Sequence, residues 1–398
     1  MNYKYKRVFV IVMDSVGVGY MKDAYKWDDE GANTLLHTSE RAGGLNIPHL
    51  NALGLGDLEN ILGTSRVSHP TSYVSKANER SNGKDTMTGH FEMMGIYTVE
   101  PFVTFTDTGF PKELIDLLEE KTGHKVIGNK SASGTEILKE LGEEQMRDNS
   151  LIVYTSSDSV LQIAASEETT GLQELYHCCE IAREICMRPE WKVGRVIARP
   201  FIGKTKDTFK RTPNRHDLAL SPSESTVMDI LKDNGFTVSC VGKIADIFNM
   251  CGVTETVKTV SNIDGMNKTI DIAKKDFTGL CFVNLVEFDS EYGHRRDPLG
   301  YAKAIEDFDV KLGELMPFLK DDDLLIITAD HGNDPTWHGT DHTREKIPLV
   351  MYSPHFLAGK CLPERDSFAD IGATILTNFH LEKPETLLGT PIKELLED

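Results

Sequence analysis

The 398-residue chain has few basic residues for its size. Its 43 lysines and arginines stand against 62 aspartates and glutamates, a formal net charge of −19. Nucleic acids and anionic membranes are bound through a basic face, so this balance argues against both kinds of partner. A small anionic substrate remains compatible with it, because bound metal ions can dominate the local field.

Long apolar runs are also missing. A membrane-spanning helix needs about 20 consecutive apolar residues, and no segment of the sequence approaches that length. The first apolar run, Val8 to Met13, is too short for the core of a signal peptide and ends at an acid. We therefore expect a soluble, cytoplasmic protein with no membrane partner.

Cysteine is sparse, and none of the seven residues forms a C-x-x-C pair. The odd number and the spacing argue against a disulfide framework or a zinc ribbon, so we expect free thiols. Two cysteines are adjacent, Cys178 and Cys179, in a stretch with a helical pattern, YHCCEIAREI. Zinc binding at this pair is an alternative with little support.

Short apolar runs that end in an acid or a small polar residue recur along the chain. Four of them are RVFVIVMD (7–14), LCFVNLVEFD (280–289), LLIITAD (324–330) and IPLVMYSP (347–354). Such runs are typical of buried strands in a parallel sheet. Helical patterns lie between them, so we predict an α/β fold whose largely parallel sheet is flanked by helices.

The length suggests about two domains, and the middle of the chain differs from its flanks. Residues 101–218 are richer in helices and loops and have strand candidates of their own at 151–158 and 195–201. We predict that this segment is an inserted, smaller α/β domain. Residues 1–100 and 219–398 would then form the core together.

Three acids, Asp14, Asp289 and Asp330, lie at or just past the ends of predicted strands. Taken alone, an acid after a strand is usually a helix cap or a turn residue. In parallel sheets, however, ligand sites form at the carboxyl ends of the strands, where these acids would meet.

Three histidines accompany the acids. His294 follows Asp289 in a glycine-containing turn, and His331 and His342 belong to the dense segment TADHGNDPTWHGTDHTRE (328–345). Three carboxylates and three imidazoles exceed the needs of one tetrahedral ion. They suit two divalent cations about 3.5–4 Å apart, an arrangement used for phosphoryl transfer.

Other polar residues near these motifs are predicted not to bind metal. Asp334, His338 and Asp341 are expected to be loop residues, although Asp341 could orient a histidine. Glu287 is expected to neighbour the site without binding metal.

A polar loop, SNGKDTMTGHFEMMG (81–95), offers two hydroxyl nucleophiles, Thr86 and Thr88. A hydroxyl held against a divalent cation loses its proton more easily. Lys84 could neutralise phosphate oxygens. The local pattern does not choose between the two threonines.

A third set of residues suits a phosphorylated sugar. Arg195, Arg211 and Lys243 could bind phosphate, and Asp158 could accept hydrogen bonds from sugar hydroxyls. Surface salt bridges would explain each of these residues equally well.

The combined motifs DSVGVG, GKDTMTGH, FDSEYGHRRDP and the segment 328–345 resemble those of bacterial phosphopentomutases. This family belongs to the alkaline phosphatase superfamily of two-metal enzymes. The resemblance covers nearly the whole chain, including IARPF and TPNRHD in the predicted insertion. It implies an isomerase that interconverts ribose 1-phosphate and ribose 5-phosphate, and their deoxy forms, with two manganese ions.

The resemblance also implies roles for individual residues. Asp14, Asp330 and His331 would bind one ion, and Asp289, His294 and His342 the other. Thr86, rather than Thr88, would carry the phosphoryl group, with a 1,5-bisphosphate intermediate and a sugar bisphosphate such as glucose 1,6-bisphosphate as activator. The insertion corresponds to the cap of the family, and the residues near the sugar phosphate would be Ser156, Asp158, Arg195, Arg211 and Lys243.

The main alternative is another two-metal enzyme of the superfamily, either a phosphatase, a phosphodiesterase or a cofactor-independent phosphoglycerate mutase. The last of these typically has a serine nucleophile, so the threonine and the cap motifs argue against it. A non-catalytic metal- or phosphate-binding protein is a more distant alternative. The sequence leaves open the preference between ribose and deoxyribose, the metal loaded, the cap movement and the oligomeric state, a monomer included.

Overall fold

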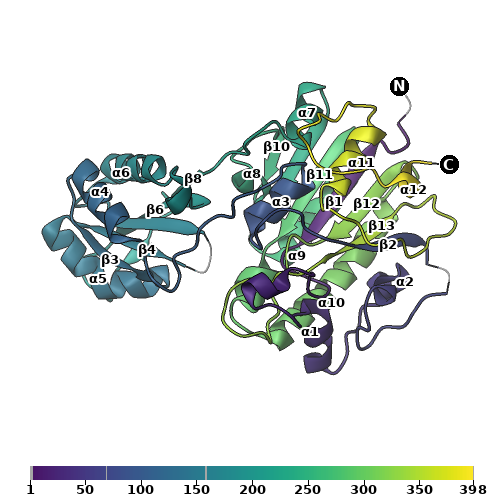
Figure 1. Cartoon of the computed structure of the whole chain (residues 1–398), viewed down its shortest axis with the longest axis horizontal. Coiled ribbons are helices and arrows are strands. Elements are labelled where there is room, and N and C mark those ends of the chain that lie inside the picture. The colour runs from purple at the N-terminus through teal and green to yellow at the C-terminus, as the bar shows by residue number, and fades with distance from the viewer. Residues whose placement is uncertain (1–2, 69, 157–158, 398) are drawn as a thin grey trace. The chain divides into compact units, whose positions relative to one another are not determined.

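The computed structural model describes residues 3–68, 70–156 and 159–397. The chain divides into two compact units (Figure 1). Unit 1 comprises Met1–Val99 and Ser221–Asp398, and unit 2 comprises Glu100–Leu220. Each unit contains a β-sheet flanked by helices, so the predicted α/β class is confirmed.

The described residues of unit 1 form a seven-stranded sheet with the order β10-β9-β11-β1-β12-β13-β2. All seven residues of the central strand β1 are buried, and β1 pairs in parallel with β11 and β12. Helices cover a parallel sheet on both faces, which explains the continuous apolar runs. The strands are β1 (Arg7–Met13), β2 (Ser72–Ala77), β9 (Thr237–Val241), β10 (Glu255–Val257), β11 (Gly279–Leu285), β12 (Asp323–Thr328) and β13 (Ile347–Tyr352).

One predicted strand runs in the opposite direction. β13 pairs antiparallel with β12, with Leu325 opposite Tyr352, and β2 pairs antiparallel with β13. The prediction that all four apolar runs lie parallel is therefore wrong for residues 347–354. A parallel return needs a crossover, usually a helix, and residues 329–346 between the two strands form no helix.

Two groups of helices flank this sheet. In one group α10 packs on α1, α2 and α9, and in the other α11 packs on α3, α7 and α12. Thr226 caps α7 in a capping box with Asp229, and Asp297 caps α10 just before Pro298. The helices are α1 (Thr34–Ala42), α2 (Pro48–Ala52), α3 (Thr86–Met93), α7 (Val227–Asp233), α8 (Ile244–Ile247), α9 (Asn262–Ala273), α10 (Pro298–Leu315), α11 (Asp370–Asn378) and α12 (Lys393–Leu396), with 3-10 turns at Ala24–Trp27, Leu55–Asp57 and Met316–Phe318.

Unit 2 has a mixed sheet of its own with the order β3-β4-β5-β6-β7, and β8 also pairs with β6. Side chains alternate along β5: Leu161 and Ile163 join the apolar cluster under α4 and α6, whereas Ala164 joins the one under α5. The sheet is therefore covered on both faces. The elements are β3 (Val126–Ser131), β4 (Leu151–Thr155), β5 (Val160–Ser166), β6 (Arg195–Ile202), β7 (Lys210–Arg211) and β8 (His216–Ala219), with α4 (Lys112–Thr122), α5 (Gly134–Asp148), α6 (Leu172–Ile185) and the 3-10 turn Pro189–Trp191.

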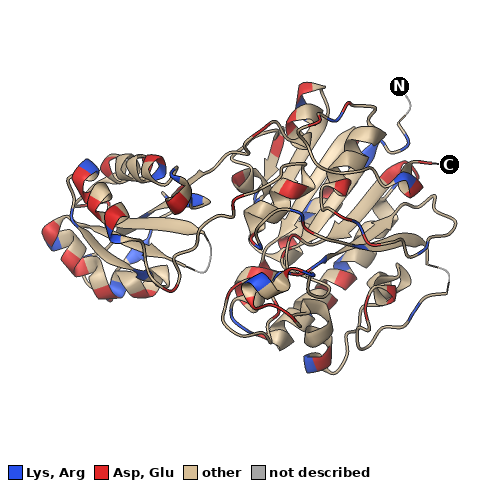
Figure 2. Ribbon diagram, in the orientation of Figure 1, with Lys and Arg blue, Asp and Glu red and all other residues tan. Residues whose placement is uncertain are grey.

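Charged side chains are distributed over the helices of both units, with basic positions interspersed among the acidic ones (Figure 2). Among the described residues, no helix combines the length and the apolar character that crossing a membrane requires.

Candidate active site

Two acids follow the ends of neighbouring strands in the sheet of unit 1. β1 and β12 are parallel neighbours, with Val12 opposite Thr328, and Asp14 and Asp330 follow at their carboxyl ends. The backbone N–H of Ser15 donates to Asp330 Oδ1 at 3.0 Å and ties the two strand ends together. Both acids are buried. This is the edge at which α/β sheets bind ligands.

The third acid reaches the site by another route. β11 ends at Leu285, and Asp289 lies farther along, in a turn of π-helix, Phe288–Gly293. The predicted strand 280–289 is therefore too long at this end. Short π-helical turns are rare and occur frequently at functional sites.

Asp289 forms a group with two histidines. His294 Nε2 lies 3.0 Å from Asp289 Oδ2, and His342 Nε2 lies 3.5 Å from Asp289 Oδ1. The two Nε2 atoms are 3.2 Å apart. Ligand atoms bonded at ~2.0–2.2 Å to one tetrahedral cation would be ~3.3–3.6 Å apart, so these separations are close to those of a metal site.

A second group adjoins the first. His331 Nε2 lies 3.5 Å from Asp14 Oδ1 and 3.3 Å from Asp330 Oδ2. Ligand atoms of Asp14, Asp289 and His331 lie within 4.8 Å of one another, so Asp289 belongs to both groups. The structure thus brings the six residues together, and we call them the Asp/His group. Their assignment to individual ions stays a prediction.

Backbone carbonyls orient two of the imidazoles. The Nδ1 atom of His294 donates to Thr340 O at 2.7 Å, and Nδ1 of His331 donates to Gly332 O at 3.0 Å. A carbonyl oxygen can only accept, so in the neutral ring the proton lies on Nδ1 and the lone pair of Nε2 faces the carboxylates. Metal-binding histidines are commonly held in this way.

The charges of the Asp/His group fit divalent cations. Burial, together with the carboxylates of Asp330 and Asp289, raises the pKa of Asp14 well above its usual range. Asp14 Oδ1 is buried and accepts no hydrogen bond from the residues that the structure describes. Burial also lowers the pKa of His331, which favours the neutral ring that binds metal. Crowded buried carboxylates of this kind need a cation.

The two threonines at the start of α3 have different partners. Asp85 caps the helix: its Oδ1 accepts from Met87 N and Thr88 N at 3.0 and 3.1 Å. The Thr88 hydroxyl donates to Asp85 Oδ2 at 2.5 Å. The Thr86 hydroxyl lies instead 3.2 Å from His331 Nε2. Thr88 therefore serves the helix cap, whereas Thr86 faces the Asp/His group.

Two asparagines that the sequence analysis missed support the acids. Asn284 Nδ2 donates to Asp14 Oδ2 at 2.8 Å, and Asn333 Nδ2 donates to Asp289 Oδ1 at 2.7 Å. Asn284 lies inside the otherwise apolar strand β11, GLCFVNL. A polar side chain in a buried strand is the sequence signal that would have pointed to it.

Glu345 anchors the segment that follows β12, and the sequence analysis did not single it out. Its carboxyl group accepts from Thr34 N at 2.9 Å and from Thr343 Oγ1 at 2.6 Å. A Cβ atom at Gly332 would lie 2.4 Å from Glu345 Oε1. The glycine after His331 therefore makes room for this buried acid.

Arg344 connects the same segment to the loop before Thr86. Its guanidinium is buried and donates to Glu79 Oε2 at 2.5 Å, to Glu79 O at 3.0 Å and to Gly83 O. A charge-assisted contact to one carboxylate oxygen, together with hydrogen bonds to two backbone carbonyls, fixes the position of this loop. No local pattern in the sequence indicates a contact between residues 265 positions apart.

The nearby polar residues that were predicted not to bind metal have other surroundings. Asp341 Oδ2 pairs with Lys84 at 3.1 Å, so this lysine already has a carboxylate partner. Asp334 is buried and lies 2.5 Å from His37 Nδ1. His338 is exposed.

The predicted substrate residues are distributed over both units. Lys243, at the start of α8 in unit 1, is near enough to Asp14 for its charge to oppose the rise in the Asp14 pKa. Unit 2 contains Ser156, Arg195 and Arg211, and Asp158 lies outside the described residues.

Arg211 lines an open pocket of unit 2 together with Arg199 and Arg215. Burial and the positive charge of Arg215 lower the pKa of Arg199. Arg215 also pairs with Asp217 at 2.5 Å. Three arginines around one pocket form a concentration of positive charge that suits an anion.

Known proteins similar to this chain point to one family. Residues 6–383 match the model of the Metalloenzyme superfamily. A protein named phosphopentomutase from Clostridium botulinum (strain Alaska E43 / Type E3) is 56% identical over 393 residues, which is 99% of each chain. One of the same name from Clostridium tetani (strain Massachusetts / E88) is 55% identical over 395 residues, also 99% of each chain.

Among solved structures, the PH0037 protein from Pyrococcus horikoshii matches 98% of this chain and 100% of its own. The TM-score is 0.50 and the identity 13%, so this likeness shows the fold alone. The relatives of more than half identity, matched over nearly their whole length, and the superfamily match together show that the chain belongs to the phosphopentomutase family of the Metalloenzyme superfamily.

Proposed function

We propose that this protein is a phosphopentomutase, an isomerase that interconverts ribose 1-phosphate and ribose 5-phosphate and the corresponding deoxyribose phosphates. Full-length relatives of this name at 55–56% identity support the assignment. The observation in the structure that carries it is the Thr86 hydroxyl 3.2 Å from His331 Nε2, beside a buried group of three acids and three histidines.

In unit 1, the Asp/His group would bind metal and Thr86 would act as the nucleophile. The Asp/His group would hold two manganese ions, as the family resemblance implies. Bound divalent cations neutralise phosphoryl oxygens and lower the pKa of a hydroxyl held against them. Thr86 would carry the phosphoryl group, because the Thr88 hydroxyl is already engaged by Asp85.

In the proposed reaction the phosphorylated Thr86 donates its phosphoryl group to the free hydroxyl of a pentose monophosphate. The bond between Thr86 Oγ1 and phosphorus breaks as the sugar oxygen bonds to phosphorus, and the proton of the sugar hydroxyl is transferred to Thr86 Oγ1, which gives a 1,5-bisphosphate and free Thr86. The bisphosphate reorients in the site, and its other phosphoryl group is transferred to Thr86. A sugar bisphosphate such as glucose 1,6-bisphosphate would load Thr86 at the start, which explains its expected role as activator.

Unit 2 would act as the cap that binds the sugar phosphate and excludes water, since water would turn the mutase into a phosphatase. Ser156, Asp158, Arg195, Arg211 and Lys243 are the residues proposed to contact the substrate. The pocket lined by Arg199, Arg211 and Arg215 supports a phosphate contact in this unit. A location in the cytoplasm belongs to the same proposal.

The test of the activity is phosphorus NMR of the manganese-loaded protein with ribose 5-phosphate and a trace of glucose 1,6-bisphosphate. We expect a growing ribose 1-phosphate signal without inorganic phosphate. Inorganic phosphate alone would identify a hydrolase, which is the main alternative. If neither signal changed, 3-phosphoglycerate would be the next substrate, and its turnover would favour the phosphoglycerate mutase alternative.

Two matched variants test the nucleophile. Thr86→Val and Thr88→Val remove one hydroxyl each with little change in shape. After incubation with glucose 1,6-bisphosphate, mass spectrometry should find one phosphoryl group on the wild-type protein and on Thr88→Val, and none on Thr86→Val. Phosphorylation of folded Thr86→Val at position 88, with mutase turnover, would contradict the assignment.

A further inference from the structure

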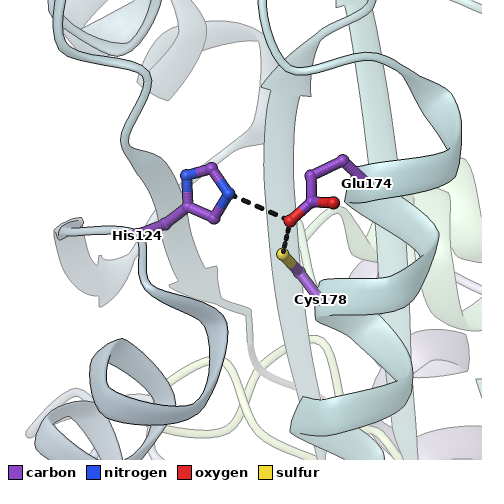
Figure 3. A group of neighbouring side chains, drawn as sticks. All are labelled: His124, Glu174 and Cys178. Carbon is purple, nitrogen blue, oxygen red and sulfur yellow. Dashed lines mark hydrogen bonds and ion pairs between the residues drawn. The ribbon is translucent and has the colours of Figure 1, made fainter.

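A second group of metal-type ligands lies within unit 2. His124 follows α4, and Glu174 and Cys178 lie one turn apart on α6 (Figure 3). The three side chains point toward one another, and their ligand atoms lie within 4.8 Å of each other. We call them the His124 group. They share no residue with the Asp/His group of unit 1.

The separations in the His124 group are near those of ligands on one cation. His124 Nε2 lies 3.1 Å from Glu174 Oε1, and Cys178 Sγ lies 3.8 Å from the same oxygen. In a tetrahedral zinc site with Zn–N and Zn–O bonds of ~2.0–2.1 Å and Zn–S of ~2.3 Å, the matching edges are ~3.3 and ~3.5 Å. These two edges fit to within a few tenths of an ångström, and the third, between His124 Nε2 and Cys178 Sγ, lies within 4.8 Å and would shorten toward ~3.5 Å when an ion binds.

The hydrogen bonds of His124 also favour a cation. Its Nδ1 donates to Asn149 O, 2.8 Å away. A neutral imidazole has one proton, so the lone pair of Nε2 would then face Glu174 Oε1, which can itself only accept when ionised. Two acceptors at 3.1 Å repel each other unless a metal cation or a proton lies between them.

The surroundings suit a metal ion with one position open to water. Cys178 is fully buried, the His124 side chain is 14% exposed, and that of Glu174 is 44% exposed. The thiol of Cys178 would bind the ion as a thiolate, because a coordinating thiol is deprotonated.

We propose that His124 Nε2, a carboxylate oxygen of Glu174 and Cys178 Sγ bind one zinc ion in unit 2, with water as the fourth ligand. Imidazole, carboxylate and thiolate together suit zinc better than the harder cations that oxygen-rich sites prefer. The ion would join the chain after α4 to α6, two parts of the unit that already pack together. This site is structural, and it does not depend on the proposed mutase activity.

Cobalt is the probe that separates this site from the Asp/His group. A thiolate bound to Co²⁺ gives a charge-transfer absorption in the near ultraviolet, and the Asp/His group contains no sulfur. We expect this absorption when Co²⁺ is added to chelator-treated wild-type protein, and we expect Zn²⁺ to abolish it. Its absence in the wild-type protein would overturn the proposal and leave a hydrogen bond between His124 and Glu174 as the explanation.

The adjacent cysteine provides a matched control, because Cys179 is equally buried but lies outside the His124 group. Cys178→Ser should lose the cobalt absorption and one bound metal ion per chain, whereas Cys179→Ser should keep both. His124→Gln should weaken binding and serves as a second variant if Cys178→Ser fails to fold. An unchanged absorption in folded Cys178→Ser would overturn the proposal.

Thermal unfolding gives a second readout. A ligand that binds only the folded state raises the unfolding temperature, so Zn²⁺ should raise it for wild type and Cys179→Ser more than for Cys178→Ser. The three proteins are compared with manganese already present, so that the Asp/His group is loaded in each. Equal shifts in all three would count against the site.

Discussion

The polar residues of the two units differ in burial and in the sign of their charge. In unit 1, Asp14 and Asp330 are 1% and 0% exposed, and the three carboxylates of their group are buried beside histidines. In unit 2, Arg199 is half-buried, Arg211 is exposed, and arginines surround an open pocket. Cations suit the first region and anions the second. The overall charge of −19 therefore does not describe the local charges, which are negative in the first region and positive in the second. This separation suits a metal-dependent enzyme with a phosphorylated substrate.

The two regions also differ in how they are held. Backbone carbonyls orient two histidines of the Asp/His group, and Asn284 and Asn333 hold two of its acids. At the arginine pocket of unit 2, Arg215 is held by an ion pair with Asp217 at 2.5 Å. Substitutions in unit 1 should therefore affect metal binding and turnover, whereas those in unit 2 should affect substrate affinity.

The largest effect is expected from Asp330→Asn, which removes a buried charge beside His331. Losing several kcal/mol of electrostatic stabilisation should lower kcat/KM roughly 10³-fold or more. The control is Asp322→Asn, an exposed acid just before the other end of β12. Mutase assays and metal analysis at saturating manganese check both variants. Normal metal content and turnover in Asp330→Asn would contradict the expectation that the buried acids of unit 1 control metal binding and turnover.

Glu345 should make the stability of unit 1 depend on pH. Burial raises its pKa from 4.5 to about 7 in the folded protein. A raised pKa means that its contribution to stability is fully present below about pH 4.5, decreases as the pH rises and is lost above about pH 7. The loss is on the order of 3 kcal/mol.

Glu345→Gln does not titrate, so the difference in unfolding free energy between wild type and variant should change across this window. Urea unfolding of both metal-free proteins, from about pH 4 to about pH 8, measures it. A difference that is constant with pH would show that Glu345 does not titrate there.

A smaller effect is expected from Asn333→Ala, which removes the hydrogen bond to Asp289. Loss of a residue that orients a metal ligand typically lowers metal affinity about 10–100-fold. Asn262→Ala is the control, because Asn262 is also largely buried and its Oδ1 accepts from the backbone N–H of Glu287. Manganese titration should separate the two variants. Equal losses would mean that general destabilisation explains the effect.

The smallest effect is expected in unit 2, from Arg211→Ala. Losing one charged hydrogen bond to a phosphate should raise KM for ribose 5-phosphate about tenfold, with little change in kcat. The control is Lys210→Ala, the exposed neighbour on the same strand. A fall in kcat with unchanged KM would indicate that Arg211 acts on the chemical step. Unit 2 would then affect turnover as well as substrate affinity.

Much of this architecture follows from patterns between neighbouring residues. The apolar runs at 7–14 and 324–330 locate β1 and β12, and the capping residues Thr226 and Asp297 locate the starts of α7 and α10. These patterns are local, because a buried strand is indicated by a short apolar run, and a helix by its capping residues and the ~3.6-residue period of its apolar side chains. The same strands indicate the edge at which Asp14 and Asp330 meet.

Other features depend on contacts between residues far apart in the chain. The antiparallel direction of β13, the support of Asp289 by Asn333 and the contact of His124 with Glu174 have no local signature. The choice between Thr86 and Thr88 also rests on a distant histidine, since only the folded chain places His331 beside one hydroxyl and leaves Asp85 for the other. Local sequence specifies the elements and the residue types that each element carries, whereas pairing direction and side-chain partners arise from packing the elements against one another.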